Sequence, residues 1–189
     1  MFAVGSLVAY PAQGVGRVEK IETQVVGGIS AELYIVRILS NNVTLLVPVG
    51  NVENVGLRAV YNKKQGREIL AYLEDRSDFS GYSGQNWNRR YREYSDKLKS
   101  NDLRDVAYVL KELILIGRDK DLSFGERRLL EQAQGLITLE LSFALDKEQD
   151  EIKQQIEDMY ADVLKARKSQ DDFDDDEEEM KFETDNEEE

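Results

Sequence analysis

The first sixty residues place apolar and polar side chains in short runs that predict β-strands. The runs are rich in Val, Ile, Leu and Tyr and occupy residues 7–10, 14–21, 32–38 and 43–49. Gly27-Gly28 and Asn41-Asn42 fall between runs, where tight turns belong. Short strands joined by turns predict a small antiparallel barrel or a curled sheet.

From Lys63 onward the apolar positions recur every three or four residues, which is the period of an α-helix. A polar segment over 75–84, rich in Ser, Gly and Asp, predicts a loop. A capping box at Ser123 and Glu126 predicts the start of a later helix. The predicted helix after the loop carries one aromatic and apolar face, made of Trp87, Tyr91, Tyr94 and Leu98.

These patterns predict an α+β multidomain chain: a small N-terminal antiparallel β barrel, then a compact all-α helical bundle, then an acidic tail. We expect the barrel over residues 1–62 and the bundle over 63–145. An additional amphipathic helix is predicted over 146–168. Residues 169–189 hold few apolar side chains and many like charges, so we expect them to be disordered.

The charge of the chain is concentrated in that tail. The whole chain carries −13. Residues 169–189 contain thirteen acidic residues and one lysine, a net −12, which leaves −1 for residues 1–168. The body is therefore nearly neutral, and the acidic total does not argue against a nucleic-acid partner. No leader or membrane-spanning segment is evident, so we expect a cytoplasmic protein.

The composition argues against an enzyme. The chain has no Cys and no His, which removes thiolate nucleophiles and the commonest general base and metal ligand. The glycines at 14 and 16 follow no phosphate-loop pattern, because no Lys-Ser/Thr pair follows them. The acidic run at 171–179 lacks the fixed geometry that a cation site needs. We expect no metal and no cofactor.

A better candidate for function is the sequence Trp-Asn-Arg-Arg-Tyr-Arg at 87–92, which interleaves aromatic rings with cations. Arginines contact phosphates, and an exposed aromatic ring can stack on bases or wedge between them. Arg127-Arg128 offers a second basic point. The alternative interpretation is structural, because an aromatic stripe on a helix usually belongs to the core and a charge pair usually faces solvent.

Four motifs, in order, resemble the CarD/CdnL family of bacterial RNA polymerase-binding transcription regulators. The resemblance runs from residue 2 to about 145. Its motifs are V-A-Y-P-A-Q-G-V-G at 8–16, L-V-P at 46–48 with V-G-L-R at 55–58, W-N-R-R-Y at 87–91 and L-S-F-G-E-R-R-L-L at 122–130.

The resemblance implies a Tudor-like N-terminal barrel that grips the β subunit of RNA polymerase, and a helical domain that contacts promoter DNA. In the family, a tryptophan at the position of Trp87 enters the minor groove at the upstream edge of the −10 element and slows collapse of the bubble. Arg89, Arg92 and Arg127 match positions of cations that face DNA, whereas Arg90 is expected to face inward.

The polymerase contacts differ from the family pattern in charge. Some members carry Arg at positions that align with Gln24 and Leu46, and neither residue is basic here. We therefore expect the contact, at Gln24, Leu46, Val47 and Pro48, to use backbone pairing along a strand edge and apolar side chains. The helix over 146–168 and the tail lie outside the resemblance.

Two functions remain open on the sequence alone. The first is a monomeric regulator that binds polymerase and the promoter fork and stabilises the open complex, associating with the nucleoid through polymerase. The alternative is a polymerase-binding adaptor whose helices and tail recruit another protein without touching DNA. Exposure of Trp87 separates them, because a solvated ring favours DNA contact and a packed ring favours the adaptor.

Overall fold

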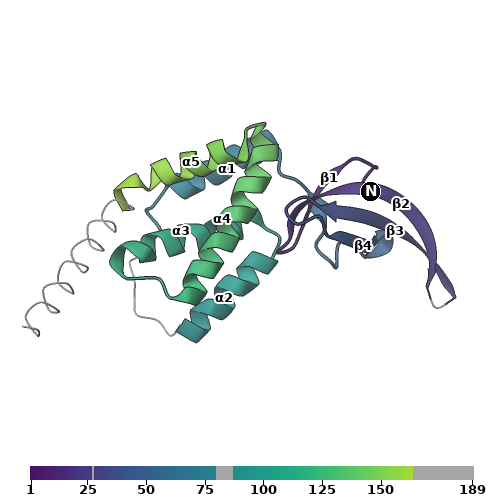
Figure 1. Cartoon of the computed structure of the whole chain (residues 1–189), viewed down its shortest axis with the longest axis horizontal. Helices are drawn as coiled ribbons and strands as arrows, with labels where there is room; N and C mark the ends of the chain where they lie inside the picture. The colour runs from purple at the N-terminus through teal and green to yellow at the C-terminus, as the bar shows by residue number, and fades with distance from the viewer. Residues whose placement is uncertain (27, 80–86, 164–189) are drawn as a thin grey trace, which may run out of the picture.

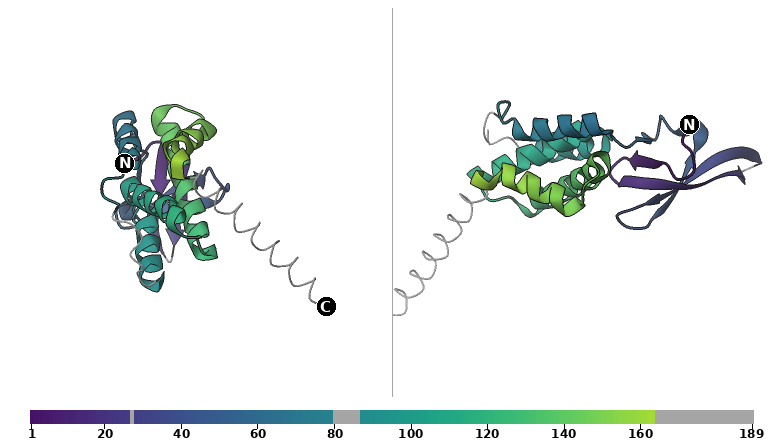
Figure 2. Two further views of the ribbon diagram at one scale, coloured as in Figure 1. Left: turned by 90° about the vertical axis from the view of Figure 1, so that its left-hand side faces the viewer. Right: turned by 90° about the horizontal axis from the view of Figure 1, so that it is seen from above.

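The computed structural model describes residues 1–26, 28–79 and 87–163, and for Val26, Ile29 and Trp87 it describes the backbone alone. A sheet stands at one end of the molecule and a bundle of helices at the other (Figures 1 and 2). The predicted fold class, an antiparallel sheet followed by helices, is confirmed. The predicted disordered tail at 169–189 lies outside the described residues.

Within the described residues, five antiparallel strands form one sheet in the order β4-β3-β2-β1-β5. Its central hairpin, β2 with β3, is its longest part and projects away from the helices (Figure 1). Because β4 and β5 remain at the two edges among the described residues, the sheet curls without closing into a barrel. The strands are β1 (Leu7–Tyr10), β2 (Gly14–Val26), β3 (Ile29–Ile38), β4 (Thr44–Pro48) and β5 (Arg58–Ala59), and the 3₁₀ helix η1 (Val49–Asn51) follows β4.

The alternation read from the sequence places one face of each strand inward. A register shift between Val18 and Lys20 bends β2, as a β-bulge does. The inward side chains make a small core of their own, consisting of Val8, Val18, Tyr34, Val36, Ile38, Val47 and Leu57.

The helices share a second, larger core. Asp102 caps α3 by accepting from the Arg104 N–H, and the predicted capping box of Ser123 and Glu126 starts α4. The helices are α1 (Lys63–Glu74), α2 (Trp87–Lys99), α3 (Leu103–Asp119), α4 (Phe124–Leu145) and α5 (Gln149–Met159).

Helix α5 is part of this core rather than an appendage to it. Asp146 adopts a left-handed conformation that ends α4 and turns the chain back, so that α5 packs beside α4. Ile152 and Ile156 are buried, and the Tyr160 hydroxyl donates to the Leu73 carbonyl of α1. The apolar face that was predicted over 146–168 thus covers the other helices.

Sheet and bundle are joined by polar contacts. Arg58 of β5 donates from Nη2 to Oε2 of Glu140 in α4 at 3.0 Å, and Glu140 is only 3% exposed. The Asn101 amide, just before α3, donates to the Ala9 carbonyl at 3.1 Å. Gly14 has φ +80, and a β-carbon there would lie 3.2 Å from Leu136 of α4. These contacts fix the sheet relative to the helices.

Candidate nucleic-acid interface

Helix α2 carries the W-N-R-R-Y sequence and is bound to the bundle by a buried stripe. Arg90, Tyr94 and Leu98 are 7%, 1% and 2% exposed and lie four residues apart, one turn above another. Tyr91, by contrast, is 44% exposed. The buried face of α2 therefore contains Arg90 rather than Tyr91, which was predicted to lie on it. Arg90 faces inward as expected.

Glu126, in the first turn of α4, is the partner that makes burial of Arg90 possible. It is 1% exposed and accepts from Arg90 Nη2 at 2.7 Å and from Lys120 Nζ at 2.7 and 2.9 Å. It also accepts from the Ser123 backbone N–H at 2.8 Å, which is one half of the capping box. One carboxylate thus caps α4 and ties α2 to it.

The charge of this carboxylate follows from its surroundings. Burial is the largest influence on the pKa of Glu126 and raises it, but hydrogen bonds from Lys120 and Ser123 together outweigh burial and hold the pKa below its usual value. The side chain is therefore an anion at neutral pH, and its pairs with Arg90 and Lys120 are ionic.

The predicted DNA-facing arginines of α2 lie outside this anchor. Arg89 and Arg92 are both exposed, one on each side of Arg90 in the sequence. Trp87 is the first residue of α2, one turn before Arg90, and its side chain lies outside the described residues. The ring's exposure, which separates the two functional hypotheses, is thus not described, whereas the backbone that carries it is anchored.

The chain leading toward Trp87 is anchored at its other end as well. Lys111 of α3 is 1% exposed, and its Nζ lies 2.6 Å from Oδ1 of Asp78 and 3.0 Å from the Asp75 carbonyl oxygen. The same ammonium stands 3.8 Å from the centre of the Tyr72 ring, a cation–π contact. Asp78 and Arg90 are therefore fixed points on either side of residues 80–86.

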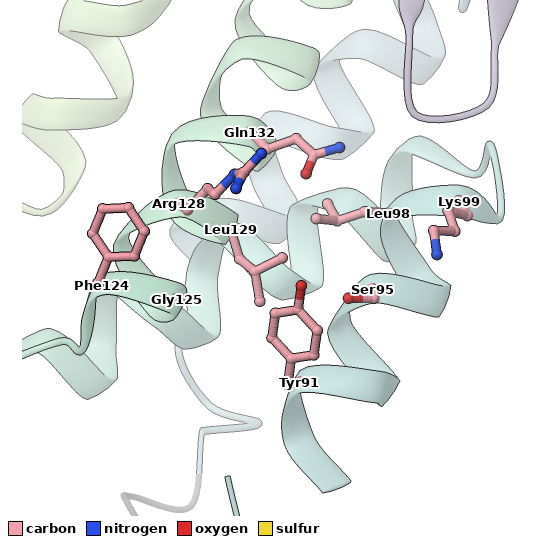
Figure 3. A pocket seen from close by; sticks show the side chains of 9 residues that line it. All are labelled: Tyr91, Ser95, Leu98, Lys99, Phe124, Gly125, Arg128, Leu129 and Gln132. Atoms are coloured by element: carbon pink, nitrogen blue, oxygen red, sulfur yellow. The ribbon is translucent and has the colours of Figure 1, made fainter. Parts of the chain in front are cut away.

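A groove between α2 and α4 contains residues that the sequence analysis did not single out. Its volume is about 430 Å³. Arg127 is exposed on α4, but the neighbouring Arg128 is the arginine that lines this groove. Figure 3 shows the lining side chains, which are Tyr91, Ser95, Leu98, Lys99, Phe124, Gly125, Arg128, Leu129 and Gln132.

One of these residues could have been found from the sequence. Phe124 lies outside the apolar stripe of its helix and is 77% exposed, so a large ring in the first turn of α4 contributes nothing to the core. Exposed rings of this size mark binding surfaces when they cluster with others. Lys99 gave no such signal, because isolated charges on helices usually face solvent. Arg128 was noted only as part of the basic pair Arg127-Arg128, of which the resemblance selected Arg127.

The predicted polymerase contacts fall on two places of the sheet. Leu46 is 57% exposed on the edge strand β4, and Pro48 beside it is exposed too. Val47 is 2% exposed and packs in the core of the sheet, so only its backbone is available to a partner. Gln24 lies on β2 opposite Ala31, in the part of the hairpin that extends past β4.

The described residues contain neither a metal-binding cluster nor a membrane-spanning helix. Residues 1–26, 28–79 and 87–163 bring no three acidic side chains together in a way that could hold a metal ion. Within the same ranges, no helix combines the length and apolarity that a membrane span requires.

Comparisons with known proteins identify the family. The family model "CarD-like/TRCF RID domain" matches residues 2–61, and the model "CarD, C-terminal domain" matches residues 68–157. A protein of Bacillus subtilis (strain 168) named "Putative transcription factor YdeB" is 25% identical over 143 residues, which are 75% of this chain and 90% of the relative. The second model extends into α5, to residue 157, so the expectation that the resemblance ends near residue 145 was wrong. The chain belongs to the CarD-like family of transcription regulators that interact with RNA polymerase.

Proposed function

We propose that this regulator binds the β subunit of RNA polymerase through its sheet and the upstream fork of the promoter through α2, and that it thereby stabilises the open complex. The observation that carries the DNA contact is the burial of Arg90 against Glu126, 2.7 Å apart. This anchor holds one face of α2 against the bundle and leaves Arg89 and Arg92 exposed.

The DNA contact that we propose uses Arg89 and Arg92 for phosphates and Trp87 for the fork. Phosphate contacts fix position without reading sequence, and an aromatic wedge acts at an unstacked base step. Arg127, exposed on α4, is a further proposed phosphate contact. The DNA-contacting unit that we propose spans residues 63–163, because α5 shares the core of the other helices.

The polymerase contact that we propose uses the free edge of β4 in residues 1–62. An exposed edge strand can accept another strand, because its outward N–H and C=O groups lack sheet partners. Leu46 would supply the apolar contact, and Pro48, which has no N–H to donate, would end the pairing. Gln24 would reach a second point on the polymerase.

The ion pair of Arg58 with Glu140 supports a two-point attachment. A regulator that holds polymerase with its sheet and DNA with its helices gains affinity only if both sites are presented together. The contacts between sheet and bundle favour one relative placement. We propose that the protein works in this way as a monomer in the cytoplasm, reaching the nucleoid through polymerase, and that it acts by binding rather than by catalysis.

The DNA contact is tested with purified RNA polymerase by measuring the lifetime of the open complex. The double variant Arg89→Ala, Arg92→Ala should bind polymerase normally but lose the added lifetime. Each lost phosphate contact should also reduce the slope of log DNA affinity against log salt concentration by about 1. Trp87→Ala should lose the added lifetime too. Arg67→Ala, which removes an exposed cation from α1, is the control. If both α2 variants left the lifetime of the open complex unchanged, the result would favour the alternative function, a polymerase-binding adaptor that does not touch DNA.

The polymerase contact is tested by retention of the β subunit. Leu46→Glu places a charge on the proposed strand edge and should abolish retention without unfolding, because the side chain is 57% exposed. Val4→Glu, at 60% exposure in the segment before β1, is the matched control. Full retention of β by Leu46→Glu would show that the contact lies elsewhere.

A further inference from the structure

The groove between α2 and α4 has the chemistry of a site for an apolar side chain with anionic neighbours. Its floor contains Leu98 and Leu129, which are 2% and 5% exposed. Phe124 and Tyr91 stand at the groove with 77% and 44% of their surface exposed. The close-up shows Tyr91 pointing between α2 and α4 (Figure 3).

The charges of the groove are all of one sign. Lys99 contributes an ammonium from α2 and Arg128 a guanidinium from α4, and among the described residues no acidic side chain lines the groove. An occupant that buries a ring against Leu98 and Leu129 while placing carboxylates near these two cations would satisfy both features.

This chain carries such a segment in its own tail. Phe173 stands within the sequence Asp-Asp-Phe-Asp-Asp-Asp at 171–176, so one aromatic ring is flanked by five carboxylates. The tail as a whole, residues 169–189, carries thirteen acidic residues against one lysine. Charge and apolar character thus match the groove.

The tail is long enough to reach. Phe173 follows Val163, which is buried in the helical core, after ten residue steps along the chain. An extended chain spans at most about 3.3–3.6 Å per residue, or about 33 Å here. The 22 residues of α4 are about 33 Å long, and α5 already returns along part of that length toward the α4 end that forms the groove (Figure 1).

We propose that Phe173 and its flanking aspartates dock into the groove between α2 and α4 of the same molecule. Arg92 directly follows the groove residue Tyr91 in the sequence and precedes Lys99, another groove residue, by about two turns of α2. A docked tail therefore places carboxylates beside the surface that would meet phosphate. In this respect the inference rests on the proposed function: the tail competes with promoter DNA.

The docking is weak enough to be displaced. Tethered segments reach effective concentrations in the millimolar range, so an intrinsic Kd of about 1 mM leaves about half of the molecules docked. Its ionic part is screened by salt, because the Debye length shortens from about 8 Å at physiological ionic strength to about 3 Å at 1 M. Docking should therefore weaken as salt rises, and about twofold tighter DNA binding is expected when docking is abolished.

The test is paramagnetic broadening of amide NMR signals in the full-length chain. The chain has no cysteine, so Gln170→Cys gives a single attachment point for a nitroxide label three residues before Phe173. We expect broadening at Ser95, Lys99 and Gln132 at low salt, and its loss at high salt. Broadening confined to α5, or spread evenly over the surface, would overturn the proposal.

Matched variants distinguish docking in the groove from a general attraction between the acidic tail and the cations of α4. Arg128→Glu should remove the broadening at the groove, whereas Arg127→Glu, the same charge change at the adjacent exposed residue, should preserve it. Phe173→Ser, which keeps every tail carboxylate, should also remove it. Equal effects of the two arginine variants would mean that the tail is attracted to α4 without entering the groove.

A second arm adds short duplex DNA to the labelled protein. Relief of the broadening at the groove would support competition with DNA. Persistence of the broadening at a DNA concentration that saturates the protein at low salt would reject the competition and leave docking of the tail intact. The NMR measurement on the protein alone contains neither DNA nor polymerase. Failure of the proposed function and failure of tail docking therefore give different results.

Discussion

Substitution of Glu126 by alanine is the sharpest test of how the α2 surface is held. The carboxylate is 1% exposed, pairs with Arg90 at 2.7 Å and accepts two bonds from Lys120. Alanine removes all of these acceptors, including the carboxylate that pairs with the buried guanidinium of Arg90. Lys120 is less affected, because its side chain is 28% exposed and can turn to water.

The expected loss of stability is large. Removing one partner of a buried ion pair costs about 3–5 kcal/mol, because the remaining charge stays desolvated. Loss of the capping box contributes in the same direction, by about 0.5–2 kcal/mol. We expect a total near the upper part of the first range, since α4 can retain its cap at Ser123.

Urea unfolding followed by circular dichroism measures this loss. With a slope of about 2 kcal/mol per molar urea, a loss of about 4–5 kcal/mol lowers the midpoint by about 2–2.5 M. Glu131→Ala, an exposed glutamate on the same helix, is the control and should change stability by less than about 0.5 kcal/mol. Partial loss of open-complex stabilisation should accompany Glu126→Ala even where the variant remains folded.

A double-mutant cycle with Arg90→Ala identifies the cause. If loss of the Glu126 carboxylate from the buried guanidinium is the main cost, the double variant should be less destabilised than the sum of the two single variants, with a coupling energy of about 0.5–3 kcal/mol. Additive effects would refute the ion-pair argument, as would a Glu126→Ala midpoint equal to that of the control.

Three further predictions concern the loop anchor, acid stability and free DNA. Asp78→Ala should destabilise the protein more than Lys111→Met in urea unfolding. Asp78→Ala leaves the 1% exposed ammonium of Lys111 without its counter-ion, whereas Lys111→Met leaves a carboxylate that is already half exposed to water. A larger loss of stability for Lys111→Met would contradict this prediction. The Arg76 hydrogen bond holds the pKa of Asp162 at about 2, below its usual 3.8, so the stabilisation is present above pH 3.8 and is lost as the pH falls toward 2. Urea midpoints of wild type and Asp162→Asn should therefore converge over that interval, and a constant gap would count against the pair. Free duplex should bind weakly and release with rising salt in a fluorescence titration, because the body is nearly neutral; tight binding at physiological salt would contradict this.

The local features of this protein could be predicted from its sequence. Alternation in the first sixty residues and the helical period after Lys63 depend on side chains a few residues apart, so they are visible without a structure. The same holds for the capping box of Ser123 and Glu126, which spans four residues and was found in place. The order of the motifs was sufficient to indicate the family.

The partners of the buried charges were decided by packing alone. Arg90 was expected to face inward, but its partner Glu126 is 36 residues away, and Arg58 and Glu140 are 82 apart. The chain contains 38 acidic residues, so each arginine has many possible counter-ions, and no sequence pattern selects among them. Burial selects them, because a desolvated charge persists only where a counter-ion is within reach.

The same dependence on tertiary structure explains the open sheet, the placement of α5 and the groove. A strand pattern specifies which face is buried but leaves open whether the last strand returns to the first. An amphipathic helix specifies an apolar stripe but not what covers it. The groove beside Phe124 exists because α2 and α4 meet at one place in space, and residues on separate helices become neighbours only after the chain has folded.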